Sequence, residues 1–410
     1  MKKLSTLDKS EIEQLCRRAV SLEEVVQRIK PIIEDVMKRG DKAIVEYTKK
    51  FDNVEIESVK LELDELKRIA TGISPQLKEA IDRIMEHVID VNKIMVQKER
   101  IYIKRGVIIT FKPIPLDRPG IYIPKNYVST LIMLTSIAHV AGCREIVVAT
   151  PPLPNGKVSE AFAYVVCKLP NCQLFVGNGV ACIAAMAYGT ESIPQVDKLF
   201  GPGNIYIQAA KYLVSTRVEI DGIEGPTELV LYIDTVDENK VKRAIYDVLA
   251  ELEHGVASIA VVLSKSESTL LRFEQEYEQV KHGKNLGVLT TLLVDNEEQV
   301  VEFVNKFAPE HFEIITDDVK RVKKILRNAK NVGVVSLNTS CTYLDYCAGP
   351  CHVLPTSGFA RGRGTLTPLD FMKWVAIVEN YDKDLVRYGK ELAEVENMQL
   401  HKRSLELLEE

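Results

Sequence analysis

Histidine is the residue whose side chain exchanges protons near neutral pH. This chain of 410 residues contains only seven histidines. They are His87, His139, His254, His282, His311, His352 and His401. Imidazole serves both as a general base and as a common metal ligand. The neighbours of each histidine therefore indicate where chemistry can occur.

Glu310 and His311 are adjacent, and they lie between a helical pattern and the strand-like run Phe312-Glu313-Ile314-Ile315. A carboxyl group beside an imidazole at the boundary of two elements can supply two proton-transfer groups. The alternative is a pair of loop residues exposed to solvent. The pattern alone leaves both interpretations open.

Glu251 and His254 stand three residues apart near the end of a helical pattern that Gly255 terminates. This spacing places both side chains on one face of a helix, which suits two metal ligands. The alternative is a solvated acidic helix end whose histidine interacts favourably with the helix dipole. Without other evidence the second interpretation is favoured.

Asp345 and His352 belong to a region rich in glycine and cysteine after the last strand-like run. Loops that follow strands are where α/β proteins place ligands, and an aspartate near a histidine strengthens that interpretation. Three cysteines lie in the same region, Cys341, Cys347 and Cys351. Their spacing fits no CxxC pattern, so ordinary reduced thiols are favoured over a metal or redox role.

Two glycine-containing turns could hold a phosphate. Gly177-Asn178-Gly179 and Gly201-Pro202-Gly203-Asn204 each follow a strand-like run and precede a helical stretch, whose first backbone amides can bind an anion. Neither turn completes a GxGxxG fingerprint, because Cys182 occupies the third glycine position of the first. Taken alone, each is more often an ordinary strand-to-helix turn.

Hydrophobic periodicity predicts the elements that position these residues. Ser21 and Glu24 form a capping box, a helical pattern then runs to Gly40, and a second helical stretch covers residues 76–94. From about Val107, β-branched runs alternate with helical patterns, which predicts parallel α/β units in two sheets. The expected strands cover residues 145–149, 173–176, 198–200, 229–233, 259–263, 287–294 and 332–336.

After about Thr367 the pattern becomes helical again. It ends in a charged helix over residues 391–409, which carries Glu396 and His401. Composition alone would single out neither residue, because this helix otherwise reads as a solvated charged surface.

Composition excludes several classes of protein. The chain is 46% hydrophobic and 27% charged, which excludes a disordered, fibrous or disulfide-stapled chain and predicts about two or three compact units. Its net charge of −5 does not support binding to nucleic acid. Charge enters the N-terminal segment early and no apolar run is as long as a membrane span, so we expect a soluble, cytoplasmic protein with reduced cysteines.

Taken together and in this order, several segments resemble the histidinol dehydrogenase family over nearly the whole chain. The segments are Arg39-Gly40-Asp41-Lys42-Ala43, Gly120-Ile121-Tyr122-Ile123-Pro124, Ala141-Gly142-Cys143, Phe200-Gly201-Pro202-Gly203-Asn204, Gly225-Pro226-Thr227-Glu228, Glu253-His254-Gly255, Pro309-Glu310-His311, His352-Val353-Leu354-Pro355-Thr356 and His401-Lys402. The resemblance implies two incomplete Rossmann-like α/β domains with parallel sheets, small helical pieces at both ends and an intertwined homodimer.

The resemblance also implies a division of the chain. A helical piece covers residues 1–19, the first domain covers 20–120 and 229–366 with the catalytic and metal side, and the second covers 121–228 with the cofactor side. Residues 367–410 then form a helical tail that contributes to the partner's site.

Individual roles follow from the same resemblance. Glu310 and His311 match the family's proton-transfer pair. The zinc ligands match Glu251, His254, Asp345 and, from the partner subunit, His401. Contacts to the cofactor NAD match Tyr122 and Asn204. Substrate contacts match Thr227, Glu251, His254, His311, Asp345, His352, Glu396 and His401, the residues Glu396 and His401 being supplied across the dimer interface.

The activity implied is that of histidinol dehydrogenase, two successive NAD-dependent oxidations of L-histidinol through histidinaldehyde to L-histidine. His311 would accept the alcohol proton, Glu310 would activate water for the second step, and a redox-inert zinc would anchor the substrate. The alternatives are a homologous zinc-containing amino-alcohol dehydrogenase with a different substrate or cofactor, and a non-catalytic metal-binding dimer.

Three features depart from the family pattern. Glu251 stands where the family has glutamine, and with Asp345 it would bring a divalent ion to formal neutrality. Lys125-Asn126 replaces a pair of glycines, and Ala181 replaces a glutamine among the cofactor contacts. The departures therefore concentrate on the cofactor side, where Lys125 could contact a phosphate.

Overall fold

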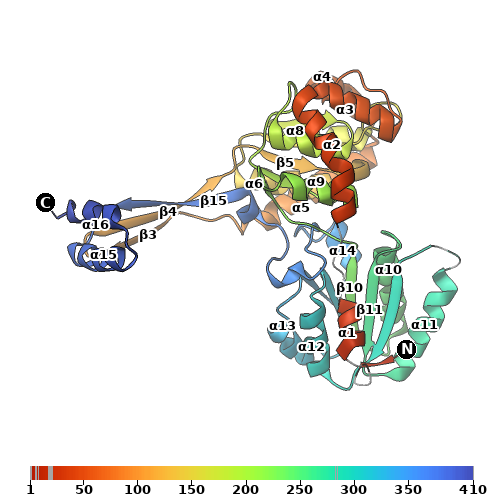
Figure 1. Cartoon of the computed structure of the whole chain (residues 1–410). Helices are drawn as coiled ribbons and strands as arrows, with labels where there is room; N and C mark the ends of the chain where they lie inside the picture. Colours follow the sequence, from red (N-terminus) through yellow and green to blue (C-terminus); the bar gives the residue numbers. More distant parts are fainter. Residues whose placement is uncertain are drawn as a thin grey trace. The chain divides into compact units, whose positions relative to one another are not determined.

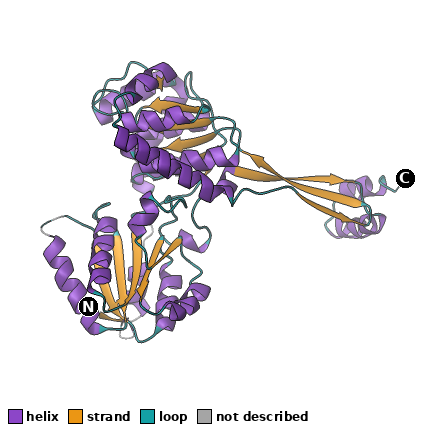
Figure 2. Ribbon diagram, turned by 180° about the vertical axis from the view of Figure 1, so that it is seen from behind, coloured by secondary structure: helices purple, strands orange, loops and turns teal. Residues whose placement is uncertain are grey.

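The computed structural model describes residues 2–4, 7, 9–16, 22–281, 283 and 285–409, and the chain divides into two compact units (Figure 1, Figure 2). The first unit comprises Met1–Met95 and Leu116–Phe371, and the second comprises Val96–Pro115 and Met372–Glu410. Among the helices of the described residues, none is both long and apolar enough to cross a membrane.

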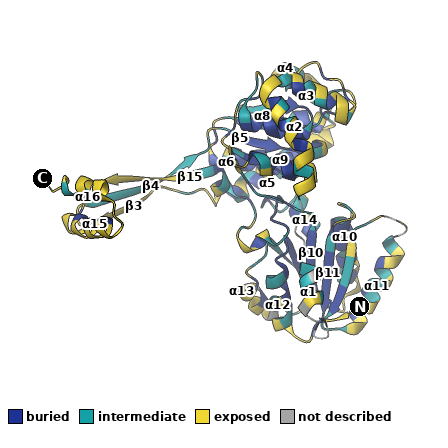
Figure 3. Cartoon of the chain, in the orientation of Figure 1, coloured by how far each residue is buried: buried dark blue, intermediate teal, exposed yellow. Residues whose placement is uncertain are grey.

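One sheet of the first unit has six strands that all pair in parallel. The strands are β1 (Lys2–Lys3), β10 (Glu228–Asp234), β11 (Ile259–Ser264), β12 (Val288–Leu293), β13 (His311–Thr316) and β14 (Val334–Leu337). Their order is β1-β12-β11-β10-β13-β14. The central place of β10 explains its continuous apolar run, because a strand covered on both faces buries nearly every side chain (Figure 3).

Helices cover both faces of this sheet. On one face lie α10 (Glu238–Leu252), α11 (Glu267–Lys281) and α14 (Cys341–Tyr346), and on the other lie α1 (Lys9–Cys16), α12 (Glu297–Phe307) and α13 (Val319–Asn328). Ile315 of β13 packs on the α10 side, whereas Phe312 and Ile314 pack on the other side. Because side chains alternate along a strand, His311 and Glu313 share the face of Ile315.

The second sheet of the first unit also has six strands and repeats this arrangement. The strands are β2 (Lys60–Leu61), β5 (Pro119–Tyr122), β6 (Ile146–Thr150), β7 (Cys172–Val176), β8 (Lys198–Phe200) and β9 (Glu219–Ile220). Their order is β2-β7-β6-β5-β8-β9, and only β2 pairs antiparallel. Each sheet contains five strands that follow one another in the chain, β10 to β14 in the first and β5 to β9 in the second. Counted along the chain, they lie side by side in the order third, second, first, fourth, fifth, as in doubly wound folds. The two predicted parallel α/β sheets are confirmed.

The early helices of the chain pack on the helices of the second sheet. Those of the sheet are α6 (Val128–Ala141), α7 (Glu160–Lys168), α8 (Gly179–Tyr188) and α9 (Ile205–Val214), and the early ones are α2 (Glu23–Arg39), α3 (Asp41–Tyr47), α4 (Leu63–Ala70) and α5 (Pro75–Lys93). Helix α2 contacts α8 and α9, and α5 contacts α6 and α7. Residues Gly179–Ala187 of α8 are all buried, so this helix requires an outer cover. The division that the resemblance implies, with residues 20–120 and 229–366 in one domain, stays a prediction.

Local signals set several helix ends. Helix α2 ends before Gly40, whose positive φ of 55° suits glycine, and α5 matches the predicted stretch of residues 76–94. The capping residue Ser21 lies outside the described residues. Short helical turns complete the first unit, the π-helical η2 (Thr48–Asp52) and the 3-10 turns η3 (Pro124–Asn126), η4 (Phe359–Arg361) and η5 (Pro368–Phe371).

The second unit corrects the expectation of a wholly helical tail. It contains an antiparallel sheet in the order β15-β4-β3, formed by β3 (Arg100–Lys104), β4 (Val107–Pro115) and β15 (Met372–Glu379), and the helices α15 (Lys383–Val395) and α16 (Gln399–Glu406). The apolar run Trp374–Val378 forms a strand because it pairs with β4, a partner distant in sequence. The predicted helix over residues 391–409 is also broken, since Asn397 takes a left-handed conformation with φ 57°.

A buried ion network fixes the loop after β8. Lys211 of α9 is fully buried, and its Nζ lies 2.5 Å from Asp221 Oδ1 and 2.8 Å from Glu224 Oε2. Asp221 also accepts a hydrogen bond of 2.7 Å from the backbone N–H of Gly201. Arg363 adds an ion pair of 3.0 Å to Glu224. The network therefore joins α9, the Gly201 turn and the segment before β10.

Lys211→Met should lower the free energy of unfolding by about 3 to 5 kcal/mol, because it leaves two carboxylates buried without their central cation. Urea titration followed by circular dichroism measures the effect. The control is Lys93→Met, which removes an exposed ion pair of 2.9 Å to Asp90 and should change stability by less than about 1 kcal/mol. Equal effects of the two substitutions would contradict the prediction.

Candidate active site

The candidate site lies at the amino ends of β10 and β13. These strands pair with Leu229 opposite His311, and this register lets the backbone N–H of Glu228 donate a hydrogen bond of 2.8 Å to Glu310 Oε1. Ligands of α/β folds usually lie at the carboxyl ends of strands. Here α10 and α14 run back from those ends, so Glu251 and Asp345 reach the opposite edge of the sheet.

His311 is a buried, neutral imidazole. Its side chain is 5% exposed, and its Nε2 lies 4.0 Å from Glu251 Oε1. Burial lowers the pKa of His311 to about 3, and the nearby His352 and His254 contribute to this shift. Nδ1 has no hydrogen-bond partner among the described residues. The ring is therefore neutral over the neutral pH range, with one nitrogen unprotonated.

Glu310 is the second proton-transfer group that the sequence predicts. It is buried, and burial raises its pKa well above the ordinary value, with the charges of Glu251 and Glu228 adding to the effect. Because the carboxyl group is held by the N–H of Glu228 on one oxygen, its orientation is set by the backbone of β10. Glu310 and His311 are thus buried side by side, and the interpretation as an exposed loop pair is wrong.

Glu251 and Asp345 place more negative charge in the same space. Glu251 is 2% exposed, and burial followed by the charge of Asp345 raises its pKa, although a hydrogen bond from the Cys341 thiol opposes the shift. Burial also raises the pKa of Asp345. His254 follows the end of α10 instead of lying within it, and its Nδ1 is 3.9 Å from Glu251 Oε2. The interpretation of Glu251 as part of a solvated helix end is therefore wrong.

The cluster fits a divalent cation. Ligand atoms of Glu251, Glu310 and His311 all lie within 4.8 Å of one another, and Glu251 Oε1 has no hydrogen-bond partner among the described residues. Carboxylate oxygen and imidazole nitrogen are donors that zinc accepts. A cation here would offset the repulsion between the carboxylates. This group shares only Glu251 with the ligand set that the resemblance implies, and the predicted ligands stay a prediction.

His352 is held at both ring nitrogens. Nδ1 lies 2.7 Å from the carbonyl oxygen of Asp345, and Nε2 lies 3.0 Å from Thr130 Oγ1 on α6. Burial lowers the pKa of His352. The ring therefore joins the Asp345 segment to a helix of the second sheet, and its predicted contact with substrate stays a prediction. Thr130 carries no signal in the sequence that would have revealed this contact.

Thr227 lies in the segment that enters β10. It is half-buried, and its carbonyl oxygen accepts a hydrogen bond of 2.9 Å from the N–H of Ile259. The next residue, Glu228, is buried and accepts a hydrogen bond of 2.7 Å from the N–H of Ser357. Glu228 belongs to a segment that resembles the family, and the sequence indicates no role for it, although its backbone N–H contacts Glu310 directly.

The cofactor-side residues lie at the carboxyl edge of the second sheet. Tyr122 ends β5 and is buried under Gly179, where an added Cβ would lie 2.5 Å from the Tyr122 hydroxyl. Asn204 is exposed and caps α9, since its Oδ1 accepts hydrogen bonds from the N–H groups of Tyr206 and Ile207. This edge is where nucleotides bind in doubly wound folds, and the two contacts stay predictions.

The altered loop after Pro124 has an unusual backbone. Lys125 and Asn126 both adopt positive φ, 50° and 58°, a conformation that glycine adopts more readily. The buried side chain of Asn126 donates a hydrogen bond of 2.9 Å to the carbonyl oxygen of Pro151. These contacts hold the loop without the pair of glycines. Ala181 is fully buried in the first turn of α8.

Glu396 and His401 belong to the second unit. Glu396 follows α15 and His401 lies on α16, and both side chains are exposed. Their predicted role at the site of a partner subunit stays a prediction.

Comparison with known proteins identifies relatives. The chain matches the family described as histidinol dehydrogenase over residues 15–408. Histidinol dehydrogenase of Saccharolobus solfataricus is 38% identical over 387 residues, which cover 93% of this chain and 95% of that protein. Histidinol dehydrogenase of Methanosarcina barkeri is 32% identical over 418 aligned positions, covering 98% of this chain and 95% of that protein.

Solved structures give the same result. Histidinol dehydrogenase from Elizabethkingia anophelis superimposes with a TM-score of 0.88 at 28% identity, covering 98% of this chain and 96% of that one. Lactaldehyde dehydrogenase from Escherichia coli reaches a TM-score of 0.52 at 11% identity and covers 85% of this chain and 91% of that one. This second likeness concerns the fold alone.

Glu251→Gln should stabilise the chelator-treated protein by about 2 to 4 kcal/mol, because it removes a buried charge that Asp345 and Glu310 repel. Since burial raises the pKa of Glu251, the gain should be largest at alkaline pH and vanish as the pH falls to the ordinary value of 4.5. Urea titration at several pH values measures it. The exposed Glu253→Gln serves as the control, and a destabilised Glu251→Gln at alkaline pH would contradict the prediction.

Proposed function

The chain belongs to the histidinol dehydrogenase family, and we propose that it oxidises L-histidinol in two NAD-dependent steps, through histidinaldehyde, to L-histidine. The observation that carries the proposal is the buried pair of Glu310 and His311 beside Glu251 and Asp345. It unites a neutral base, a carboxyl group and a cluster of metal-binding atoms.

His311 serves the first oxidation. The hydroxyl proton of the alcohol moves to an imidazole nitrogen, while NAD supplies the acceptor for the hydride that leaves the same carbon. Because burial keeps the ring neutral, His311 enters the step with its acceptor nitrogen available. Proton loss to the base must accompany hydride loss, since otherwise the aldehyde would remain a protonated cation.

Glu310 serves the second oxidation. The aldehyde must add water before a second hydride can leave, and a carboxylate beside the carbonyl carbon accepts the proton of that water. Its raised pKa makes Glu310 a stronger base in the ionised form than an ordinary carboxylate. The hydrogen bond from the N–H of Glu228 occupies Oε1 of Glu310, so the other oxygen would accept the proton of the water.

We place a zinc ion on Glu251, His254 and Asp345, with His401 of the partner subunit as the remaining ligand. Zinc supplies a redox-inert positive charge that anchors the imidazole and amine of the substrate. The orphan Oε1 of Glu251 and the like charges around it support this placement. With two carboxylates, the ion and its ligands reach formal neutrality.

We place NAD at the carboxyl edge of the second sheet, against Tyr122 and Asn204. Support comes from the strand order of this sheet, which is the Rossmann-like order lacking its sixth strand. Lys125 follows β5 at this edge and offers a positive charge to the phosphates. Support for a homodimer comes from the second unit, where apolar side chains such as Val395 and Leu400 are 81% and 86% exposed and require cover.

His311→Asn should lower kcat for histidinol oxidation by about a thousandfold or more while leaving metal content unchanged, because the base is lost but no ligand is. Reduced NAD is followed by absorbance, and zinc by elemental analysis, before and after chelation. The control His139→Asn, on the exposed side of α6, should retain full activity. Loss of zinc from His311→Asn would move His311 into the ligand set. Oxidation of another alcohol instead of histidinol would favour a related dehydrogenase.

Mixed dimers test whether the tail completes the partner's site. His401→Ala and His311→Asn should each be inactive alone, but a mixed dimer has one site with both native groups. Random reassociation should restore about a quarter of the native activity. The control mixture combines His401→Ala with Glu396→Ala, which leaves a tail defect at every site and should restore nothing. Inactivity of purified mixed dimers would contradict supply across the interface.

A further inference from the structure

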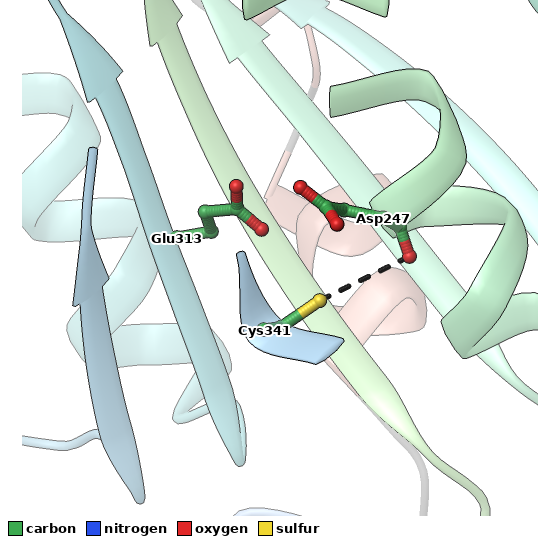
Figure 4. A group of neighbouring side chains, drawn as sticks. All are labelled: Asp247, Glu313 and Cys341. Carbon is green, nitrogen blue, oxygen red and sulfur yellow. Dashed lines mark hydrogen bonds between the residues drawn. The ribbon is translucent and has the colours of Figure 1, made fainter. Parts of the chain in front are cut away.

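A second polar cluster lies directly beneath the candidate site, on the same three elements. Glu313 of β13 is two residues beyond His311, Asp247 of α10 is four residues before Glu251, and Cys341 of α14 is four residues before Asp345. A step of two along a strand and of four along a helix returns to the same face. The second cluster therefore repeats the pattern of the site one step further along each element. Figure 4 shows its three side chains, Asp247, Glu313 and Cys341.

The contacts within this cluster are close. One carboxylate oxygen of Asp247, one of Glu313 and the sulfur of Cys341 lie within 4.8 Å of one another, and the three residues are 4%, 0% and 0% exposed. Ser340 Oγ donates a hydrogen bond to Asp247 Oδ1, and Cys341 Sγ lies 3.9 Å from the carbonyl oxygen of Asp247. Helices α10 and α14 thus meet through Asp247.

Charge balance decides the state of the two carboxyl groups. Arg243 supplies a positive charge beside this cluster. Its Nε lies 3.8 Å from Asp247 Oδ2, and its side chain is 37% exposed. Both oxygens of Glu313 are buried, and among the described residues they face the carboxyl group of Asp247 and the backbone N–H of Cys341. Two buried carboxylates that face each other cannot both remain ionised, because their charges repel. If one of them is protonated, it donates a hydrogen bond to the other.

The surroundings indicate which group holds the proton. Burial raises the pKa of Glu313 well above its ordinary value, and the charge of Asp247 adds to this. Asp247 is raised too, but Ser340 and Arg243 favour its ionised form. Glu313 is therefore the donor and Asp247 the acceptor.

We propose that Glu313 and Asp247 share one proton and, with Ser340 and Cys341, form a buried latch that fixes α10 and α14 on β13. The latch sets the distance between Glu251, Asp345 and His311 without touching the substrate. Glu313 and Asp247 are positioning residues. Their effect on turnover rests on the proposed function. The shared proton is independent of that function.

A metal ion is the competing occupant of this cluster, because aspartate, glutamate and cysteine are all zinc ligands. It would require Cys341 to lose its proton beside two carboxylates and Glu251. Three negative ligands would also outnumber the charge of the ion. A proton satisfies the same oxygens without these costs.

Two substitutions of Glu313 test the latch. Glu313→Gln keeps the shape and an N–H donor toward Asp247, so zinc affinity and kcat should stay within about threefold of the native protein. Glu313→Ala removes the donor, and both zinc affinity and kcat should fall by about 10- to 100-fold. Glu302→Ala, on the exposed side of α12, is the control and should change neither.

Infrared spectroscopy reads the proton directly and needs neither substrate nor NAD. The difference spectrum of native protein minus Glu313→Gln should contain a C=O stretching band of a protonated carboxyl group at neutral pH. Its absence would overturn the proposal, as would a second zinc equivalent per chain that Glu313→Gln loses. Equal damage by Gln and Ala would overturn it as well. If Glu313→Ala fails to fold, the infrared band and the zinc affinity of Glu313→Gln still test the shared proton. Failure to oxidise histidinol with the band present would refute the proposed function alone.

Discussion

The parallel pairing of β13 with β10 is the constraint on which the rest of the site depends. It sets Leu229 opposite His311 and so brings the N–H of Glu228 to Glu310, while Glu310 also lies within reach of Glu251. A slip by one residue would turn every side chain of β13 to the other face of the sheet. The buried apolar residues of that strand oppose such a slip, because they would exchange places with His311 and Glu313.

Concentrated negative charge is the cost of this arrangement. Glu251, Glu310 and Asp345 share a buried space, and burial raises the pKa of all three. The charge of Asp345 also raises the pKa of Glu251, and the charges of Glu251 and Asp345 raise that of Glu310. Deeper along the same elements, Glu313 and Asp247 add two more carboxyl groups. Such a cluster persists only if cations or protons compensate it. The upper layer is suited to a metal ion, and the lower layer is suited to a shared proton.

The candidate functional residues of the two sheets lie at opposite ends of the strands. The catalytic candidates occupy the amino ends of β10 and β13, whereas Tyr122 and Asn204 occupy the carboxyl ends of β5 and the turn after β8. Polar contacts join the two α/β layers near these edges. His352 contacts Thr130 of α6, and Arg363 contacts Glu224 beside the buried Lys211. Elements distant in sequence are therefore held by buried polar groups whose loss would leave unpaired charge.

Local patterns predicted the parallel strands and the pairing of Glu310 with His311, because β-branched runs and adjacent residues carry their own signal. They could not predict that Trp374–Val378 forms a strand, since its partner β4 is more than two hundred residues earlier. Glu228, Asp247 and Glu313 were missed because their roles depend on which elements meet. Once β13 and α10 are known to carry the site, however, steps of two and four residues from His311 and Glu251 lead directly to Glu313 and Asp247. The periodicity of each element thus determines the second layer as soon as tertiary structure supplies the first.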